Sequence, residues 1–173
     1  MRENSPRFLA DGMLGSLARW LRILGYDVEY RAELDDVELI REAKASGRIL
    51  LTRDLNLYRV ASRRTVEAFL VEGLSLEDAL GKLSKRFNLS LKMNPSASRC
   101  PICNSPLKTV GRGEVKGRVP KGVYQRKRKF WVCVNPSCGK IYWRGSHWDK
   151  IKETLRRVSN LSLIHISEPT RPL

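Results

Sequence analysis

Three aspartates in the first half of the chain have the residue type and placement to do chemistry. Asp11, Asp36 and Asp54 each follow a short apolar run or open the helix that comes after one. In open α/β sheets, sites form beyond the carboxyl ends of the strands, so these carboxylates would converge from distant parts of the chain. Packed carboxylates repel one another, and a divalent cation with oxygen ligands relieves that repulsion. Mg²⁺ or Mn²⁺, with phosphate oxygens completing its shell, would suit phosphodiester hydrolysis.

Each aspartate also has a purely structural explanation. Asp36 could cap its helix, Asp11 could form a turn, and Asp54 could cap the helix that follows it. Asp35 is an equally close carboxylate, and the pattern alone does not choose between it and Asp36. Residues 1–97 contain neither histidine nor cysteine, which argues against thiol, imidazole-base or zinc-hydrolase chemistry in this half.

Three arginines lie near these positions in the sequence and could contact phosphate or stabilise developing negative charge. Arg19 and Arg22 are better explained as residues on the solvated surface of a helix. Arg53 directly precedes Asp54 and is therefore predicted to contact nucleic acid.

All four cysteines lie in the second half, as two closely spaced pairs. Two residues separate Cys100 from Cys103, and four separate Cys133 from Cys138. Such pairs can present four thiolates to one tetrahedral Zn²⁺, which would then hold the fold and not activate water. Disulfides are the alternative, and the lack of an export signal disfavours them. His147 could replace a ligand, although helix capping or an RNA contact suits it better.

A basic run beside aromatic residues lies in the 29 residues between the cysteine pairs, which must form a long hairpin or loop. Such a run can neutralise phosphates and stack unpaired bases. A solvated loop over a small aromatic core would use the same residue types. The residues predicted here to bind nucleic acid are Arg126, Lys127, Arg128, Lys129 and Trp131.

The 173-residue chain has a net charge of +15, which is unevenly distributed. Residues 1–97 have a net charge of +2 and residues 98–150 have +11, so a polyanionic partner would meet the second part. Hydrophobic residues make up 42%, enough for a sizeable core. No stretch approaches the ~20 apolar residues of a membrane span, and no secretory signal opens the chain. We expect no membrane partner and a cytoplasmic location.

The first half alternates strands and helices. Strands are predicted for residues 7–10, 26–30, 49–52 and 66–71, and helices for residues 13–24, 55–61 and 75–87. A further helix lies between the second and third strands, with Asp35 or Asp36 as its cap and Gly47 at its end. Four alternations indicate a parallel α/β sheet flanked by helices, with Met13 on the apolar stripe of the first helix. A linker near residue 95 divides a domain of residues 1–93 from one of residues 98–158. Residues 161–173 resemble a translated sequencing adapter and are excluded as an artefact.

Four ordered motifs give these patterns a family resemblance. Residues 8–27 (FLADGMLGSLARWLRILGYD) resemble the opening of the Mut-7 C-terminal RNase domain family, a branch of the PIN-like nucleases. Residues 35–40 (DDVELI) and 49–54 (ILLTRD) resemble its second and third motifs. Residues 138–148 (CGKIYWRGSHW) are similar to the end of the zinc ribbon that follows the nuclease part. The resemblance covers roughly residues 6–150.

The resemblance implies a PIN-like fold with a small C-terminal zinc ribbon, and a metal-dependent ribonuclease that acts on RNA. It places Asp11, Asp36 and Asp54 at the catalytic positions with Mg²⁺ or Mn²⁺, and structural Zn²⁺ at the four cysteines. PIN-like sites generally use a fourth acidic residue, and where related families often have aspartate this chain has Asn56. The alternative is a non-catalytic zinc-ribbon protein that binds RNA or a ribonucleoprotein.

Overall fold

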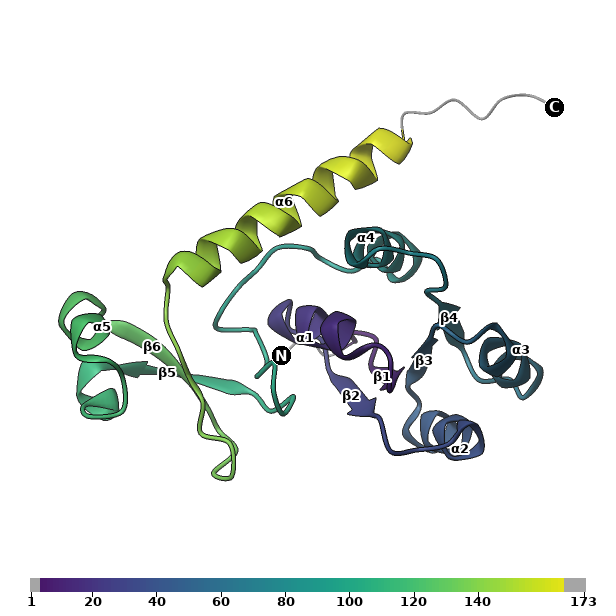
Figure 1. Ribbon diagram of the computed structural model, residues 1–173, viewed down its shortest axis with the longest axis horizontal. Coiled ribbons are helices and arrows are strands. Elements are labelled where there is room, and N and C mark those ends of the chain that lie inside the picture. The colour runs from purple at the N-terminus through teal and green to yellow at the C-terminus, as the bar shows by residue number, and fades with distance from the viewer. Residues whose placement is uncertain (1–3, 167–173) are drawn as a thin grey trace.

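The first part of the molecule is a parallel sheet between two layers of helices (Figure 1). The computed structural model describes residues 4–166, with side chains as far as Leu161. The sheet has four strands in the order β2-β1-β3-β4, and each neighbouring pair is parallel. The strands are β1 (Phe8–Asp11), β2 (Val28–Arg31), β3 (Ile49–Thr52) and β4 (Ala68–Leu70). The helices are α1 (Gly15–Ile23), α2 (Asp36–Ser46), α3 (Leu55–Arg63) and α4 (Leu76–Phe87).

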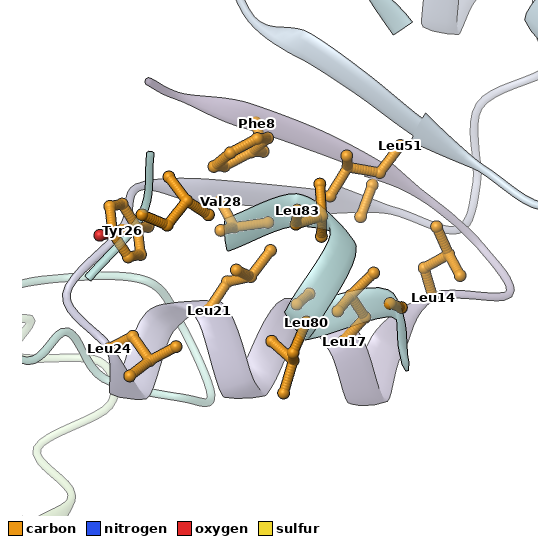
Figure 2. Close-up of a cluster of buried hydrophobic side chains, with 14 of the residues drawn as sticks. Phe8, Leu14, Leu17, Leu21, Leu24, Tyr26, Val28, Leu51, Leu80 and Leu83 are labelled. Carbon is orange, nitrogen blue, oxygen red and sulfur yellow. The ribbon is translucent and has the colours of Figure 1, made fainter. Parts of the chain in front are cut away.

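The pleat of the central strands divides the apolar side chains between two cores. Successive side chains of a strand point to opposite faces, so Phe8 of β1 joins one cluster and Leu9 joins the other. Leu50 and Leu51 of β3 divide in the same way. Helices α1 and α4 cover the first face, and α2 and α3 cover the second. Figure 2 shows the first cluster, which includes Leu14, Leu17, Leu21, Val28, Leu80 and Leu83.

Local sequence sets where the helices begin and end. Asp35 opens α2 with a capping box, in which its carboxylate accepts the Glu38 amide and the Glu38 carboxylate accepts the Asp35 amide. Gly47 ends α2 in the left-handed conformation, with φ of 64°. At the start of α4, the Ser75 hydroxyl accepts a hydrogen bond from the Asp78 amide at 3.1 Å.

The predicted order of strands and helices, and with it the parallel α/β class, is confirmed. Two predicted core positions are wrong: Val37, expected on the apolar side of the second helix, is 51% exposed, and Met13 is also exposed. The sequence places Met13 on the buried stripe of the first helix, but α1 begins at Gly15 and Met13 is 74% exposed. The physical reason is that the Met13 amide donates to the Asp11 carboxylate, which makes this segment a turn outside the helix.

The cysteine-bearing part contains a small antiparallel sheet. Its strands β5 (Leu107–Gly111), β6 (Lys129–Cys133) and β7 (Ile141–Tyr142) lie in the order β5-β6-β7. The long connection between the cysteine pairs is the hairpin of β5 and β6, whose strands are joined through the 3-10 helix η1 (Arg112–Val115) and α5 (Lys121–Arg126). A small core of Val110, Val115 and Phe130 lies beneath this connection. We call residues 99–143 the ribbon.

Arg22 in α1 links the first part to the ribbon. It is only 6% exposed, which corrects the solvated position favoured by the sequence. Its Nε donates to the Val28 carbonyl at 2.9 Å. Its Nη1 donates to the carbonyls of Pro101 at 2.9 Å and Ile102 at 3.3 Å, both between the first two cysteines. The Arg22 guanidinium group therefore donates hydrogen bonds to backbone oxygens of both the first part and the ribbon.

Asn104 provides a second link beside the first cysteine pair. Its Oδ1 accepts the Val28 amide at 3.0 Å, and its Nδ2 donates to Asp27 Oδ1 at 2.7 Å. Arg48 Nη1 donates to the same carboxylate oxygen at 2.8 Å. Burial raises the pKa of Asp27, but the hydrogen bonds from Arg48 and Asn104 outweigh that effect and lower it. The carboxylate thus stays ionised and holds the ribbon against the edge strand β2.

The last helix, α6 (Ser146–Ile166), leaves the ribbon and packs along α4 (Figure 1). Its Leu155 and Val158 are buried in the first core, although the sequence assigns them to the second domain. Of the proposed artefact tail, residues 161–166 continue the α6 backbone and residues 167–173 lie outside the described residues. Neither α6 nor any other helix within residues 4–166 is long and apolar enough to cross a membrane.

Candidate functional site

Asp11 ends β1 at the carboxyl edge of the sheet and is 8% exposed. Its Oδ1 accepts the Met13 amide at 3.1 Å, and its Oδ2 accepts the Thr52 hydroxyl. These two side chains meet because Thr52 ends β3, which is paired with β1. The Asp11 carboxylate is largely buried and accepts two hydrogen bonds, which hold it in one orientation at the carboxyl edge of the sheet.

Asp54 lies two residues beyond the end of β3 and caps α3. Its Oδ1 accepts the amides of Asn56 at 2.7 Å and Leu57 at 3.1 Å, as the capping alternative for this residue expects. Its own amide donates to Thr52 Oγ1 at 3.0 Å. A carboxylate has about four acceptor sites on its two oxygens, so two capping bonds to one oxygen leave it able to bind a cation.

Thr52 is a site residue that the sequence reasoning missed. Its hydroxyl donates to Asp11 and accepts from the Asp54 backbone, so it fixes the two aspartates relative to each other. It is fully buried at the end of a strand whose other residues are isoleucine and leucine. A hydroxyl at the last position of an otherwise apolar strand was the signal that could have found it, because buried polar groups need partners.

The structure distinguishes the two neighbouring acids at the start of α2. The carboxylate of Asp35 is occupied by the capping box, where it accepts the Glu38 amide at 2.8 Å. Asp36 is the first helical residue, and its pKa is raised by burial and then by the charges of Asp54, Asp35 and Asp11. Asp36 therefore shares an electrostatic environment with the acids from β1 and α3.

The three acids form a looser group than a preformed metal cage. Within residues 4–166, the cluster whose metal-ligand atoms all lie within 4.8 Å of one another is that of the four cysteines, and the aspartates are outside it. The donors at the rim are carboxylates and a hydroxyl, which suit the hard cations Mg²⁺ and Mn²⁺ and do not suit a soft metal. Asn56 occupies the first turn of α3 and supplies no fourth carboxylate.

The four cysteine sulfurs lie together and could hold a zinc ion. Cys100 Sγ is 3.8 Å from Cys138 Sγ, and Cys103 Sγ is 3.3 Å from Cys133 Sγ. The turn after each pair is tight: Asn104 and Gly139 follow the second cysteine of each pair with φ of 69° and 59°. His147 lies outside this cluster. Four thiolates complete a tetrahedral shell, which is the composition of a structural site.

The protonation of the thiols reflects their crowding. Burial raises the pKa of Cys103, but hydrogen bonds from Ser105 outweigh it and bring the pKa to about 6. Burial, followed by the hydrogen bond to Cys103 and the charge of Cys100, raises the pKa of Cys133 to about 12. Tyr142 Oη lies 3.1 Å from Cys100 Sγ, where its hydroxyl can donate to a thiolate. Four neighbouring thiolates would repel one another. Without a cation, some of the four thiols therefore keep their protons.

Zinc binding is expected to release at least two protons per ion at pH 7.5. The pKa of Cys138 is raised, as is that of Cys133, so both thiols enter the reaction protonated and must ionise to bind the metal. Calorimetric titration of the zinc-free protein in buffers of different ionisation enthalpy measures this number. Zinc affinity should rise with pH through this range. Release of fewer than two protons would show that the two thiols are not both protonated ligands.

The residues predicted to bind nucleic acid lie in three different places in the structure. Arg53 is exposed beside Asp54, at the aspartate edge of the sheet. Arg126 ends α5, Lys129 begins β6, and Lys127 and Arg128 connect them; all but the half-buried Lys127 are exposed. We call residues 126–129 the basic turn. Trp131 is 2% exposed and packs inside the ribbon. In Figure 1 this turn lies at the opposite end of the longest axis from α2 and α3.

The fold and the two clusters define an α/β protein with aspartates at the carboxyl edge of a parallel sheet and a cysteine cluster of zinc-ribbon type. A family model described as the Mut7-C RNAse domain matches residues 6–155, and the chain belongs to this family. The resemblance found in the motifs is thereby confirmed. No curated protein and no solved structure gives a significant match. Membership supports a nuclease-like role with RNA as the substrate or binding partner.

Proposed function

We propose that this protein is a metal-dependent ribonuclease that hydrolyses RNA phosphodiester bonds at Asp11, Asp36 and Asp54. Family membership supports the reaction class. The observation that supports the site is geometric: at the carboxyl edge of the sheet, Thr52 joins the Asp11 carboxylate to the Asp54 backbone. Asp36 is exposed, and its pKa is raised by the burial that it has and then by the charges of Asp54, Asp35 and Asp11. Carboxylates on separate elements that repel one another in this way favour a bound cation, because the cation relieves their repulsion when it binds.

In this proposal the chain's residues have separate roles. Asp11, Asp36 and Asp54 would hold Mg²⁺ or Mn²⁺, and Thr52 would keep Asp11 in position. When bound, the cation supplies charge neutralisation at the phosphate and a water that ionises more easily. Asp11 cannot turn away, because its carboxylate is anchored by two donors. Arg53, exposed beside Asp54, would contact a phosphate of the bound strand.

The ribbon would hold the substrate. Its zinc would be structural, and the turn between α5 and β6 would contact phosphates through Arg126, Lys127, Arg128 and Lys129. This turn is far from the aspartate edge along the longest axis of the molecule, so an RNA that reaches both must be extended (Figure 1). The four unpaired cysteine thiols support a reducing compartment, as expected for a cytoplasmic protein.

The proposal predicts that zinc-loaded protein cleaves labelled single-stranded RNA when Mn²⁺ is added and not when it is omitted. Asp54→Asn should lower the rate by about 10²- to 10³-fold, the usual cost of removing one preorganised charge or dipole from a site. The variant should retain its zinc and its affinity for RNA. DNA of the same sequence tests the preference for RNA.

Equal cleavage by the wild type and Asp54→Asn would refute the assigned site and point to a contaminating nuclease. RNA binding by both proteins with cleavage by neither would favour the non-catalytic alternative. In that case Asp54 would serve only to cap α3, a role its hydrogen bonds already satisfy.

A further inference from the structure

A cavity of about 470 Å³ lies where the ribbon, the linker and the start of α6 meet. The residues that carry the argument are Ile23, Arg99, Trp131, Trp143, His147 and Trp148, all of which line it. No aspartate or cysteine is among the described residues that line it, so it belongs to neither site described above. Its volume falls in the range of about 300–1,000 Å³ that is typical of small-molecule sites.

Tryptophans form much of the wall. The rings of Trp131 and Trp148 stack, with centroids 5.8 Å apart and planes inclined by 19°. Trp143 packs its ring edge-to-face with Phe130, at a centroid distance of 6.5 Å. Trp131 is 2% exposed while Trp143 and Trp148 are half-buried, so a ligand can reach only the rings of Trp143 and Trp148. Trp131 already stacks on Trp148 and the Arg144 guanidinium lies over the Trp148 ring, so a base that stacks there replaces Arg144.

Positive charge surrounds this aromatic wall. Arg144 Cζ lies 5.0 Å from the centroid of the Trp148 ring, and Lys129 Nζ lies 5.7 Å from that of Trp131. The long helix α6 begins at the cavity, with Ser146 and His147 both exposed and lining it. The first amides of a helix have no intrahelical partner and carry partial positive charge, which favours an anion. The cavity is thus mainly apolar inside. The cations of Arg144 and Lys129 lie against two of its rings, and the first turn of α6 also carries the carboxylate of Asp149.

We infer that this cavity binds one unpaired nucleobase of a single-stranded RNA, whose neighbouring phosphates lie near Arg144, Lys129 and the start of α6. Every base has a flat face that stacks on an aromatic ring, and a base within a duplex is already paired and stacked. An apolar side chain of a protein partner could also fill the cavity, but it would make no contact that uses the positive charge of Arg144 and Lys129. The net charge of +11 over residues 98–150 favours the polyanion.

The cavity is an anchoring site away from the aspartates. Helix α1 starts four residues after Asp11, and its last residue, Ile23, lines the cavity. Nine helical residues span about 14 Å at 1.5 Å per residue. A base in the cavity is therefore held several nucleotides from the bond that Asp11 would help to cleave. The inference rests on the proposed function for its choice of RNA, and it narrows that substrate to single strands.

Binding of a labelled single-stranded RNA octamer to the full-length Asp54→Asn protein tests this inference, with no Mg²⁺ or Mn²⁺ added. Adding Trp148→Leu should lower the affinity about tenfold, a typical loss for one base–aromatic stack. Trp148→Phe should restore most of the affinity. An octamer without bases keeps the phosphates, so the parent protein and Trp148→Leu should bind it equally. The affinity for duplex RNA of the same length should also be the same in the parent protein and in Trp148→Leu.

Trp20→Leu is the matched control, because Trp20 lies on α1 and does not line the cavity. It should bind the octamer as the parent does, and each protein should contain one zinc ion. Unchanged affinity in Trp148→Leu, or an equal loss for the octamer without bases, would overturn the inference and leave a peptide or another partner for the cavity.

Photocrosslinking gives a second test that needs no tryptophan substitution. An octamer containing 4-thiouridine should crosslink the parent protein within residues 143–148, as located by mass spectrometry. Crosslinks confined to residues 126–129 would place the strand on the basic turn only and refute binding in the cavity. Binding in the cavity without cleavage by the wild type under Mn²⁺ would instead refute the nuclease proposal and leave this inference intact.

Discussion

Asp11→Asn should lower the rate of RNA cleavage by about 10³-fold while leaving the fold intact. The expected loss is large because Asp11 is the most buried of the three acids, and charge at a site with little water acts strongly on a developing transition state. Single-turnover cleavage under saturating Mn²⁺ measures the chemical step. Binding of Mn²⁺ to zinc-loaded protein, followed by calorimetry, should weaken at least tenfold.

The fold should survive because asparagine keeps the shape of the side chain and one of its two hydrogen bonds. Its Oδ1 can accept the Met13 amide as the aspartate does, and its Nδ2 can donate to Thr52 Oγ1. The buried Thr52 hydroxyl then lacks an acceptor for its own proton, which costs about 1–3 kcal/mol. Removing one charge relieves repulsion at Asp36, whose pKa is raised in part by Asp11, and so offsets part of this cost. The free energy of unfolding without Mn²⁺ should therefore fall by no more than about 3 kcal/mol.

Asp35→Asn is the matched control. Asp35 is next to Asp36 in the sequence, but its carboxylate is engaged in capping α2, and asparagine is an equally good cap. Cleavage should proceed at the wild-type rate. A loss in Asp35→Asn as large as that in Asp11→Asn would show that the wrong acid at the start of α2 has been assigned, and full activity in Asp11→Asn would remove the proposed site altogether.

The second large effect is expected at Arg22. Arg22→Met keeps the length of the side chain but leaves the carbonyls of Val28, Pro101 and Ile102 without their donor. Only the hydrogen bond to the Val28 carbonyl is buried, whereas those to Pro101 and Ile102 are part-buried, so water can replace the lost donor there. One buried group left without a partner predicts a fall of about 1–3 kcal/mol in the free energy of unfolding. For a chain of this length that corresponds to a melting temperature roughly 2–12 °C lower.

Zinc affinity should fall in the same variant. Burial lowers the pKa of Arg22, and the charges of Glu29, Cys100 and Cys103 oppose that effect, so the cation lies close enough to the thiols to sense them. Its removal takes a compensating positive charge away from the cysteine cluster. Competition with a chromophoric chelator measures the affinity, and thermal unfolding followed by circular dichroism measures the stability.

Arg19→Met controls for the loss of an arginine from α1. Arg19 is exposed on the same helix, so its replacement should change the free energy of unfolding by no more than about 0.5 kcal/mol. Equal melting temperatures for the two variants would show that Arg22 does not secure the ribbon.

The sequence predicted features that depend on local pattern. The apolar run over residues 49–52 is β3 as predicted, and Gly47 ends α2 in the left-handed conformation. The four cysteines were predicted to meet from their spacing, and they do. For β3 and Gly47 a few neighbouring residues determine the outcome, because backbone conformation is a short-range property. The cysteine pairs meet over a long range, and they could be predicted to do so because the spacing within each pair is typical of half a tetrahedral zinc site.

Features that depend on distant partners were missed. Arg22 has the helical position of a surface residue, and the Pro101 carbonyl that it binds is 79 residues away. Leu155 and Val158 were placed in the domain of residues 98–158, but they pack in the first core, where α6 lies against α4. The cavity likewise forms only where α1, the linker, the ribbon and α6 meet.

The return of α6 to α4 affects how the protein can be divided for laboratory work. A fragment that stops at residue 93 would expose the apolar faces of Leu80 and Leu83, which Leu155 and Val158 help to cover in the full chain. Such a fragment is prone to aggregate during expression, because newly exposed apolar patches on different molecules associate with one another. Recombinant work on the first half alone should therefore fuse a sequence equivalent to α6 behind a short flexible tether, or retain the whole polypeptide.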